Sequence, residues 1–327
     1  MSALLQVRDL AVEFSLPPQR AFGERRILRA VDGVSFDLAA GEVLGLVGES
    51  GCGKSTTARA IVQLVPPTSG SVTFEGRQLI GLRGRELHQS RRAIQMIFQD
   101  PYASLDPRMS VARIIAEPMH NFGIAHGAEA RTKAIALMER VGLTPAQADR
   151  YPHEFSGGQR QRIGIARALA ADPRVLLCDE PVSALDVSVQ AQVINLLQEL
   201  QRELDLALVF IAHDLAVVRH LADRVAVMYA GRIVEQASTD ALFEHAHHPY
   251  TRTLLAAVPI PDPKLQRERL AATPAAGEPP SALTGWQGCA FAPRCPFADE
   301  QCRSQTPQLE VDDSDRRVAC WHPHEQA

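Results

Sequence analysis

The clearest chemical pattern in the sequence is a glycine-rich loop near the N-terminus. Gly48-Glu-Ser-Gly-Cys-Gly-Lys54-Ser55 fits the pattern G-x-x-x-x-G-K-[ST] and follows an apolar strand predicted at Val43–Val47. Glycines let backbone N–H groups turn inward around phosphate oxygens, and the helix predicted next adds partial positive charge. Lys54 would place its charge on the phosphates of a nucleotide such as ATP, and Ser55 would bind Mg²⁺. The residues assigned to this phosphate site are Gly48, Glu49, Ser50, Gly51, Cys52, Gly53, Lys54, Ser55 and Thr56.

A chance glycine-rich turn is the competing interpretation of this loop. The predicted strand before it and the predicted helix after it argue against that interpretation. Cys52 lies within the loop, and we expect its side chain to point outward and to have no redox role.

Two carboxylates end a second apolar segment. Val175-Leu-Leu-Cys-Asp179-Glu180 is predicted as a buried strand, and parallel strands present their carboxyl ends to ligands. Asp179 suits the Mg²⁺ shell, and Glu180 suits a general base that polarises an attacking water. An acidic pair at a strand end is common in isolation, so its weight comes from the phosphate loop. The two motifs together predict a nucleotidase.

A second anion-binding element follows in the segment Phe155-Ser-Gly-Gly-Gln-Arg160. Ser156, Gly157, Gly158 and Gln159 stand at the start of a predicted helix and offer N–H donors without a lysine of their own. A chain that already has a complete phosphate loop has no evident use for these donors. We therefore predict that they complete the site of another subunit across a dimer interface.

Four cysteines, Cys289, Cys295, Cys302 and Cys320, lie close together near the C-terminus. In a reducing cytosol such a group favours metal binding over disulfides. Four thiolates suit either a [4Fe–4S] cluster or zinc. The spacing C-x5-C-x6-C-x17-C does not choose between them.

The elements that must position these residues predict an α/β fold. Apolar strands at Val175–Cys178 and Leu208–Ile211 indicate a parallel sheet covered on both faces. The helix between them should bury one face, made of Val189, Val193, Leu196, Leu197, Leu200 and Leu204. Short strands are expected at Leu4–Val7 and Leu10–Phe14.

The middle of the chain is helical in pattern. Ala134, Leu137, Met138 and Val141 form one stripe of an amphipathic helix, with Gly142 as its C-cap. We predict a nucleotide-binding domain over residues 1–258, with a helical subdomain at about 103–172. A Pro- and Ala-rich linker follows at 259–282, and a small Cys-rich C-terminal domain at 283–327.

Composition excludes several classes of protein. The chain has 327 residues and a net charge of −4, so no basic field favours nucleic acid as a partner. It lacks a signal-peptide pattern and any run of about 18 apolar residues that could span a bilayer. We expect a cytoplasmic chain that reaches a membrane only by docking on other subunits.

With these motifs the chain resembles the nucleotide-binding subunits of ABC transporters from about residue 4 to 260. The family's Leu-Ser-Gly-Gly-Gln signature stands here as Phe155–Gln159. The resemblance implies the family's P-loop NTPase cassette, with a RecA-like core, an antiparallel β subdomain and a helical subdomain. It also implies three roles: Gln99 senses Mg²⁺ and water and relays to the membrane subunits, Asp186 couples the two sites of the dimer, and His213 contacts the γ-phosphate. A lone histidine after a strand is more often structural, but its spacing after Glu180 favours this role.

Phe14, at the end of an early strand, is the candidate for the aromatic residue that stacks on adenine. The stretch Pro17–Arg26 interrupts the pattern there and makes Phe22 the competing candidate. A Phe14 that faces the core is the structural alternative.

Three segments resemble the peptide-importer branch of the family: the ten residues after Gln99, Arg150–Phe155, and His248-Pro-Tyr250 with the residues that follow it. The nearest resemblance is to the second of that branch's paired ATPases. It implies an ATP-hydrolysing motor for di- and oligopeptides, peripheral on the cytoplasmic side of the bacterial inner membrane. The implied partners are a second, non-identical ATPase, two permease subunits and an extracytoplasmic substrate-binding protein.

Other cargoes and other classes of ABC ATPase are the alternatives to a peptide importer. Nickel, glutathione or a short glycopeptide are open, because the permease and the binding protein select the cargo. A soluble ABC ATPase acting on DNA or ribosomes would usually show a coiled-coil insertion or a second cassette, and exporters often fuse the membrane domain. Some peptide-importer ATPases look to carry an iron–sulfur cluster in the tail, which favours iron over zinc and zinc over no metal.

Overall fold

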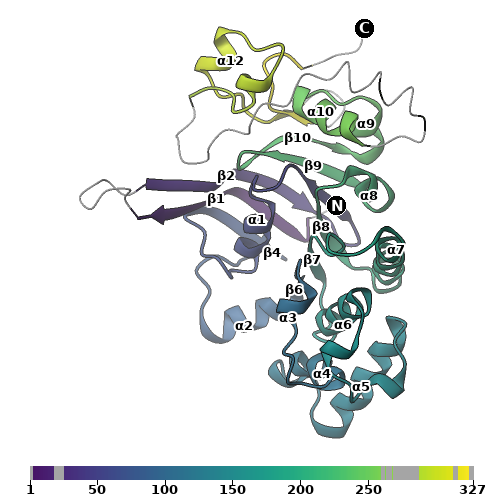
Figure 1. The fold of residues 1–327 in the computed structure, drawn as a ribbon. Helices are drawn as coiled ribbons and strands as arrows, with labels where there is room; N and C mark the ends of the chain where they lie inside the picture. The colour runs from purple at the N-terminus through teal and green to yellow at the C-terminus, as the bar shows by residue number, and fades with distance from the viewer. Residues whose placement is uncertain are drawn as a thin grey trace. The chain divides into compact units, whose positions relative to one another are not determined.

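The computed structural model describes residues 3–17, 26–258, 262, 267, 287–311 and 316–323. It divides into two units, which we call unit 1 (Met1–Leu5, Leu38–Val43 and Phe74–Ile211) and unit 2 (Gln6–Asp37, Leu44–Thr73 and Ala212–Ala327). Figure 1 labels their helices and strands. Apart from residues 262 and 267, the predicted linker at 259–282 lies outside the described residues, as does Phe22. The predicted domain boundaries therefore stay predictions.

Unit 1 contains a parallel arrangement of β6 (Ile94–Ile97), β7 (Val175–Asp179) and β8 (Ala207–Ala212), with β7 between the other two. Every residue of β7 and β8 is buried, as expected for parallel strands covered on both faces. Helix α7 (Val187–Leu204) connects them and buries Val193, Leu196, Leu197 and Leu200. The apolar face is shorter than predicted, because Val189 is half-buried and Leu204 is 37% exposed at the ends of the helix.

The rest of unit 1 is mostly helical, with a short strand β5 (Arg77–Gln78) at its start. Its helices are α2 (Gly84–Ala93), α3 (Pro101–Ser104), α4 (Val111–Asn121), α5 (Gly127–Arg140), η1 (Pro145–Gln147), η2 (Pro152–Glu154) and α6 (Gly157–Leu169). Helix α4 packs against α5 and α6. The predicted stripe lies on and just after α5, where Ala134, Met138 and Val141 are fully buried. Gly142 follows with φ +77°, which fits the predicted cap.

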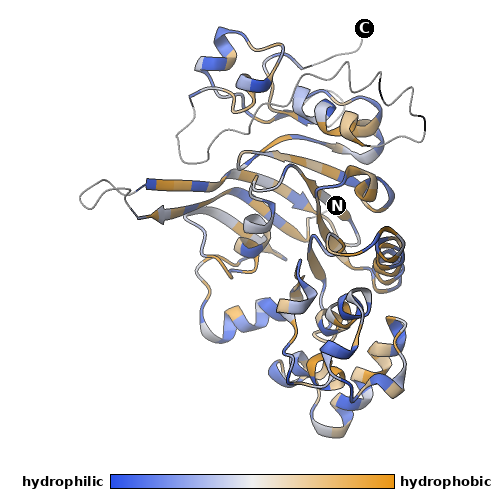
Figure 2. Ribbon diagram, viewed as in Figure 1, coloured by the Kyte–Doolittle hydropathy of each residue, from blue (hydrophilic) through white to orange (hydrophobic). Residues whose placement is uncertain are grey.

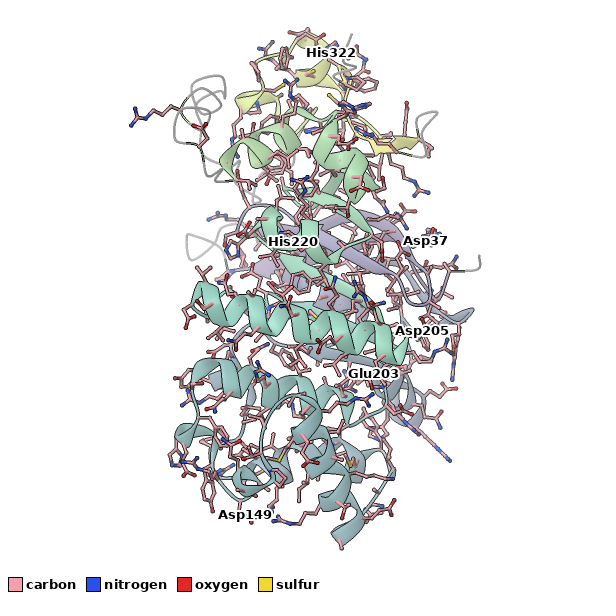
Figure 3. All side chains as sticks on the ribbon, turned by 90° about the vertical axis from the view of Figure 1, so that its right-hand side faces the viewer. Asp37, Asp149, Glu203, Asp205, His220 and His322 are labelled. Carbon is pink, nitrogen blue, oxygen red and sulfur yellow. The ribbon has the colours of Figure 1, made fainter. Side chains whose placement is uncertain are left out.

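Polar faces of unit 1 carry exposed ion pairs. Helix α2 buries none of its residues and is mostly hydrophilic in Figure 2. Arg140 pairs with Glu203, which Figure 3 shows together with Asp205 at the C-terminal end of α7. Such exposed pairs contribute little to stability, so the buried strands and helix faces carry it.

Unit 2 contains a mixed sheet built on β3 (Val43–Val47), β9 (Arg224–Tyr229) and β10 (Arg232–Ser238). Strand β3 pairs with β9 in parallel, and β10 pairs antiparallel with β9. The C-terminal strands β11 (Glu310–Val311) and β12 (Arg317–Val318) extend this sheet, because β12 pairs antiparallel with β10 and β11 with β12.

A second set of strands in unit 2 comprises β1 (Leu5–Leu16), β2 (Arg26–Leu38) and β4 (Ser69–Phe74), with β1 between β2 and β4. The prediction of two short strands before residue 15 is wrong, since β1 is continuous. Asp9 adopts φ +46°, and its N–H donates to the Ser35 hydroxyl at 2.8 Å. A local irregularity at Asp9 therefore replaces the predicted break.

The helices of unit 2 are α1 (Lys54–Ile61), α8 (Leu215–Leu221), α9 (Thr239–Glu244), α10 (Pro249–Ala257), η3 (Ala292–Arg294) and α12 (Glu300–Ser304). No helix in the described residues is long and apolar enough to cross a membrane.

His248 begins α10 from a fully enclosed position. Its side chain is 1% exposed, and its Nδ1 accepts the N–H of Tyr250 at 3.0 Å. An imidazole that accepts through Nδ1 is neutral and carries its one proton on Nε2. Burial lowers the pKa of His248 from 6.5 to about 3, because the charged form is poorly solvated there.

This burial predicts a pH-dependent loss of stability. Unfolded His248 takes up its proton below its ordinary pKa of 6.5, whereas the folded form resists protonation down to a pKa of about 3. The contribution of His248 is therefore present above 6.5 and declines as the pH falls, by about 2 kcal/mol between about pH 7 and pH 5. Chemical denaturation across this range should show that slope. His248→Asn keeps an acceptor for the N–H of Tyr250, so its free energy of unfolding should lose that much less as the pH falls. An equal pH dependence in both proteins would contradict the assignment to His248.

Candidate active site

The phosphate loop leaves β3 at Val47 and enters α1 at Lys54, as predicted. Two of its glycines are required by close backbone neighbours. A Cβ on Gly48 (φ +153°) would lie 2.1 Å from the Met228 carbonyl oxygen, and one on Gly53 (φ +108°) would lie 2.3 Å from that of Ala30. No other residue type fits either position without moving backbone.

Lys54 is enclosed by the loop. It is 4% exposed, and its ammonium donates to the carbonyl oxygens of Gly48 at 2.7 Å and Glu49 at 2.9 Å. The charge is therefore held at the loop itself, where the predicted phosphate contact needs it.

The expectation that Cys52 points outward is wrong. Its side chain is 6% exposed, and its Sγ lies 3.8 Å from Lys54 Nζ. The close turn at Gly48 leaves room for sulfur beneath the loop, since a Cβ on Gly48 would approach Cys52 Sγ to 2.8 Å. Burial raises the pKa of this thiol, which keeps it protonated and unreactive at neutral pH.

A cavity of about 100 Å³ lies beside the loop. It is lined by Leu28–Ala30 of β2, by Glu49–Cys52, and by Tyr229–Gly231. Phe14 lies on β1 and is 37% exposed, so its assignment to adenine stacking stays a prediction. Tyr229 is an aromatic residue at this cavity that the sequence patterns did not indicate.

The carboxylates of unit 1 meet the predicted glutamine. Asp179 ends β7 fully buried, and Glu180 follows it in a left-handed conformation with φ +45°. Gln99 lies just beyond β6, whose Ile97 is in register with Cys178 of β7. This pairing brings Gln99 Nε2 to 2.8 Å from Glu180 Oε2, to which it donates. A positive φ is costly for a residue other than glycine and is typical of functional sites.

The signature residues form a helix start in unit 1. Ser156 caps α6: its Oγ accepts the N–H of Gln159 at 3.4 Å, while Gln159 Oε1 accepts the N–H of Ser156 at 3.0 Å. Asp186 caps α7 in the same way by accepting the N–H of Val189 at 3.0 Å. A Cβ on Gly158 would lie 2.3 Å from Val189 Cγ1. The signature turn and the start of α7 therefore pack directly on each other.

His213 begins the segment after β8 in unit 2 and is exposed. The next residue, Asp214, caps α8 by accepting the N–H of Ala216 at 2.8 Å. The predicted site residues thus fall into a unit 1 set and a unit 2 set. In unit 1 the structure joins Gln99 with Glu180 and the signature with the start of α7.

Four cysteines line one cavity in unit 2, and the predicted metal site there stays a prediction. The cavity is lined by Cys289, Cys295, Cys302 and Cys320 together with His248, Pro249, Phe291, Ala292, Phe297, Trp321 and His322. All four are free thiols, and burial raises the pKa of each, that of Cys320 to about 11.

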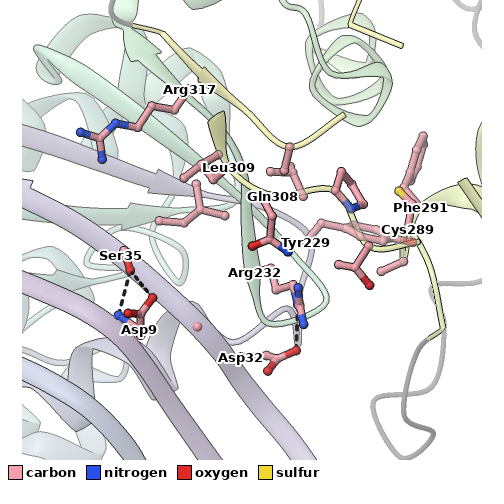
Figure 4. Close-up of a pocket in the computed structure, with 17 residues that line it drawn as sticks. Asp9, Asp32, Ser35, Tyr229, Arg232, Cys289, Phe291, Gln308, Leu309 and Arg317 are labelled. Atoms are coloured by element: carbon pink, nitrogen blue, oxygen red, sulfur yellow. Dashed lines mark hydrogen bonds and ion pairs between the residues drawn. The ribbon is translucent and has the colours of Figure 1, made fainter. Parts of the chain in front are cut away.

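A larger cavity in unit 2, of about 450 Å³, shares the lining residues Cys289 and Phe291 with the cysteine cavity (Figure 4). Several polar side chains that line this cavity already form hydrogen bonds with each other. Arg232 donates to Asp32 at 2.8 Å, and the Ser35 hydroxyl donates to Asp9 at 3.2 Å. Tyr229 lines both this cavity and the one beside the phosphate loop.

Sequence patterns missed two contacts to the phosphate loop. The N–H of Glu49 donates to the Tyr250 hydroxyl at 2.9 Å. The Glu49 carboxylate accepts two hydrogen bonds from Arg294. Two features of the sequence could have indicated these contacts: the position of Arg294 directly before Cys295, and the His248-Pro-Tyr250 motif.

Comparison with known proteins gives concordant matches. Residues 31–183 match the family "ABC transporter", and residues 234–302 match the family "Oligopeptide/dipeptide transporter, C-terminal region". The oligopeptide transport ATP-binding protein OppF of Escherichia coli is 53% identical over 94% of this chain and 92% of its own length. The di/tripeptide transport ATP-binding protein DppF of Pseudomonas aeruginosa is 48% identical over 98% of both chains.

Solved structures that match include an ATP-binding cassette and a component of an ABC transporter complex. The cassette MJ0796, in a dimeric post-hydrolysis state bound to ADP and Pi, has a TM-score of 0.64 and 27% identity over 72% of this chain and 98% of its own. CbiO1 of Clostridium perfringens, part of the ABC transporter complex cbiONQ, has a TM-score of 0.63 and 27% identity over 75% and 92% of the two chains.

Two of the three glycines of α6, Gly158 and Gly164, predict opposite effects of the same substitution. Gly158→Ala forces a Cβ into Val189 and should destabilise the protein by about 1–3 kcal/mol. Gly164→Ala meets nothing within 4 Å and should be neutral or stabilising by up to about 1 kcal/mol. Denaturant unfolding of both variants measures the difference. Equal stabilities would show that the signature turn can move away from α7.

Proposed function

The chain belongs to the family of ATP-binding subunits of oligopeptide and dipeptide ABC transporters, and we propose that it hydrolyses ATP to drive uptake of di- and oligopeptides across the bacterial inner membrane. The observation that carries the proposal is the near full-length similarity to peptide-transport subunits, which includes the C-terminal region beyond the cassette. The phosphate loop, the carboxylates and the signature supply the chemistry.

Two cassettes would close head to tail on two ATP molecules. Each γ-phosphate would meet one phosphate loop and the opposite subunit's Ser156–Gln159, with Asp186 coupling the two sites. The structure supports a role for this turn in binding an anion, because Ser156 opens a helix of 13 residues whose first N–H groups carry partial positive charge. The second ATPase is proposed to be a non-identical relative.

Hydrolysis is proposed to depend on Glu180 as general base. Its carboxylate accepts a hydrogen bond from Gln99 Nε2 at 2.8 Å, which helps to orient the carboxylate. Asp179, Gln99 and Ser55 are the proposed Mg²⁺ ligands, where the metal would neutralise charge on the phosphates. His213 is proposed to position the γ-phosphate.

The loop after Gln99 is the proposed place where the coupling helix of a permease subunit docks. Two permease subunits and an extracytoplasmic binding protein would complete the system. Its helix α3 exposes Tyr102 by 66%. The Arg160 guanidinium lies 3.7 Å from the centre of the Tyr102 ring and is itself 6% exposed. Since Arg160 follows Gln159 directly, this stacking links the signature to the docking loop. The subunit would thus be peripheral, on the cytoplasmic side of the membrane.

The proposed base can be tested by removing its charge. Glu180→Gln should still bind ATP, while its turnover should fall by about 10²-fold or more, because an amide cannot accept the proton of water. ATPase assays and nucleotide binding on the same preparations measure both. Glu203→Gln removes an exposed carboxylate at the far end of α7 and should hydrolyse ATP at the wild-type rate. Wild-type turnover in Glu180→Gln would refute the role of Glu180.

The same variants test the cargo in cells that lack the gene. Wild type and Glu203→Gln should restore uptake of labelled di- and oligopeptides, and Glu180→Gln should not. If peptide uptake never depended on the gene, the motor would stand and the cargo would be nickel, glutathione or another small molecule.

We further propose that the four cysteines bind a [4Fe–4S] cluster with a structural or regulatory role that is not part of hydrolysis. Their thiols line one cavity, and all-thiolate ligation suits such a cluster. A single tetrahedral zinc would hold four sulfurs about 3.8 Å apart, given zinc–sulfur bonds of about 2.3 Å. In the described part of the chain, the one set of three or more potential ligand atoms within 4.8 Å of one another is Asp299, Cys302 and His322. The wider spacing of the cysteines favours a cluster, which places iron and sulfide between its ligands. When bound, the cluster would supply structural cross-linking of this segment.

Anaerobic purification followed by elemental analysis tests this metal site. Wild type should carry about four irons and four sulfides per chain, and Cys295→Ser should lose them. Cys178→Ala, in buried β7, should keep the wild-type content and controls for cysteine loss. Zinc in place of iron would select the alternative metal, and a protein with neither would refute the site.

A further inference from the structure

Glu49 places a carboxylate inside the loop that is proposed to hold the phosphates of ATP. It follows Gly48 directly, and its own carbonyl oxygen accepts a hydrogen bond from the Lys54 ammonium at 2.9 Å. A negative charge so close to bound phosphates would repel them unless another group compensates it.

Arg294 compensates that charge from the C-terminal region. Its Nη1 donates to Glu49 Oε2 at 3.0 Å and its Nη2 to Oε1 at 2.9 Å, so the pair is bidentate. The Arg294 side chain is 5% exposed and the Glu49 side chain 29% exposed. A bidentate pair of this kind both neutralises a carboxylate and fixes its orientation, and partial burial strengthens it.

The backbone of Glu49 is held from the same region. Its N–H donates to the hydroxyl of Tyr250, a residue of α10 that is fully buried. The Tyr250 ring packs against Tyr229 and Phe291, with ring centres 4.5 Å and 5.5 Å apart. The side chain of Glu49 is therefore held by Arg294 and its backbone N–H by Tyr250, both in the C-terminal part of the chain.

The cysteine segment fixes the position of Arg294. Arg294 ends η3, which lies between Cys289 and Cys295, and its N–H donates to the Phe291 carbonyl at 2.9 Å. The N–H of Cys289 donates to the Cys302 carbonyl at 2.7 Å, which closes the segment on itself. The segment thus presents the guanidinium to the loop as part of an ordered turn.

We propose that Arg294 is a positioning residue for ATP binding: it neutralises and orients Glu49, so that the phosphate loop accepts the triphosphate. The cysteine segment acts on the ATP site through this contact. The inference rests on the proposed function, because it concerns the same ATP site.

A double-mutant cycle on the full chain tests the inference through the Kd for Mg²⁺-ATP. Arg294→Met leaves the Glu49 carboxylate uncompensated and should raise the Kd roughly tenfold, more at low salt than at high salt. Arg294→Lys keeps the charge but loses the two-pronged geometry, so its Kd should lie between those of wild type and Arg294→Met. Adding Glu49→Gln to Arg294→Met removes the uncompensated charge and should recover most of the lost affinity.

Arg303→Met is the matched control, since Arg303 is an exposed arginine on α12 of the same segment. Its Kd should equal that of wild type. Thermal unfolding without nucleotide and metal content, measured on every variant, separate the loop contact from general damage to the tail. A merely structural Arg294 would lower stability in the single and the double variant alike, with no recovery of affinity by Glu49→Gln.

The outcomes separate the two proposals. A wild-type Kd in Arg294→Met, or a double variant no tighter than Arg294→Met, would overturn the role of Arg294 and leave the ATPase proposal standing. A wild-type chain that bound no ATP would overturn the proposed function and this inference with it.

Discussion

Backbone approaches the phosphate loop more closely than any side chain would allow. The carbonyl oxygens of Met228 and Ala30 occupy the space that side chains at Gly48 and Gly53 would need. Both neighbours belong to unit 2, where β9 pairs in parallel with β3 and fixes the strand from which the loop leaves. The loop is therefore shaped before any ligand arrives, and the cost of ordering its N–H groups is met by folding. Lys54, enclosed by the same turn, has its charge placed by that shape.

Strand pairing performs the same task in unit 1. Gln99 and Glu180 lie far apart in sequence, but the register of β6 against β7 sets them side by side. Glu180 follows β7 with φ +45°, and its carbonyl oxygen accepts the N–H of Ser183 at 3.3 Å. The capped starts of α6 and α7 pack at Gly158, so the signature cannot move without α7. Such a rigid link would suit the proposed transmission of closure to a permease, because a loose link would absorb the motion.

Local patterns in the sequence predicted a large part of this arrangement. The buried strand before Gly48, the strand that ends in Asp179, and the helix that starts at Ser156 all follow from hydrophobic runs beside residues with distinctive chemistry. The patterns failed where tertiary packing decides. Cys52 was expected to point outward, yet the turn at Gly48 leaves its sulfur a buried place. Leu204 fits the helical stripe of α7 but lies past the covered face. A break between two strands was predicted within β1, but the strand is continuous and only Asp9 departs from strand conformation.

The contact between Arg294 and Glu49 shows why the remaining part lies beyond such patterns. The two residues are 245 positions apart, and neither has a neighbour whose type requires the other. Their pairing depends on where η3 sets the guanidinium, which depends in turn on the packing of Phe291 against Tyr229 and Tyr250. An arginine with 5% exposure must nonetheless find an anion, since an unpaired charge at that depth would cost more than the fold could offset. Once Arg294 is known to be buried, its charge requires an anionic partner. The structure identifies that partner as Glu49, a residue of the phosphate loop.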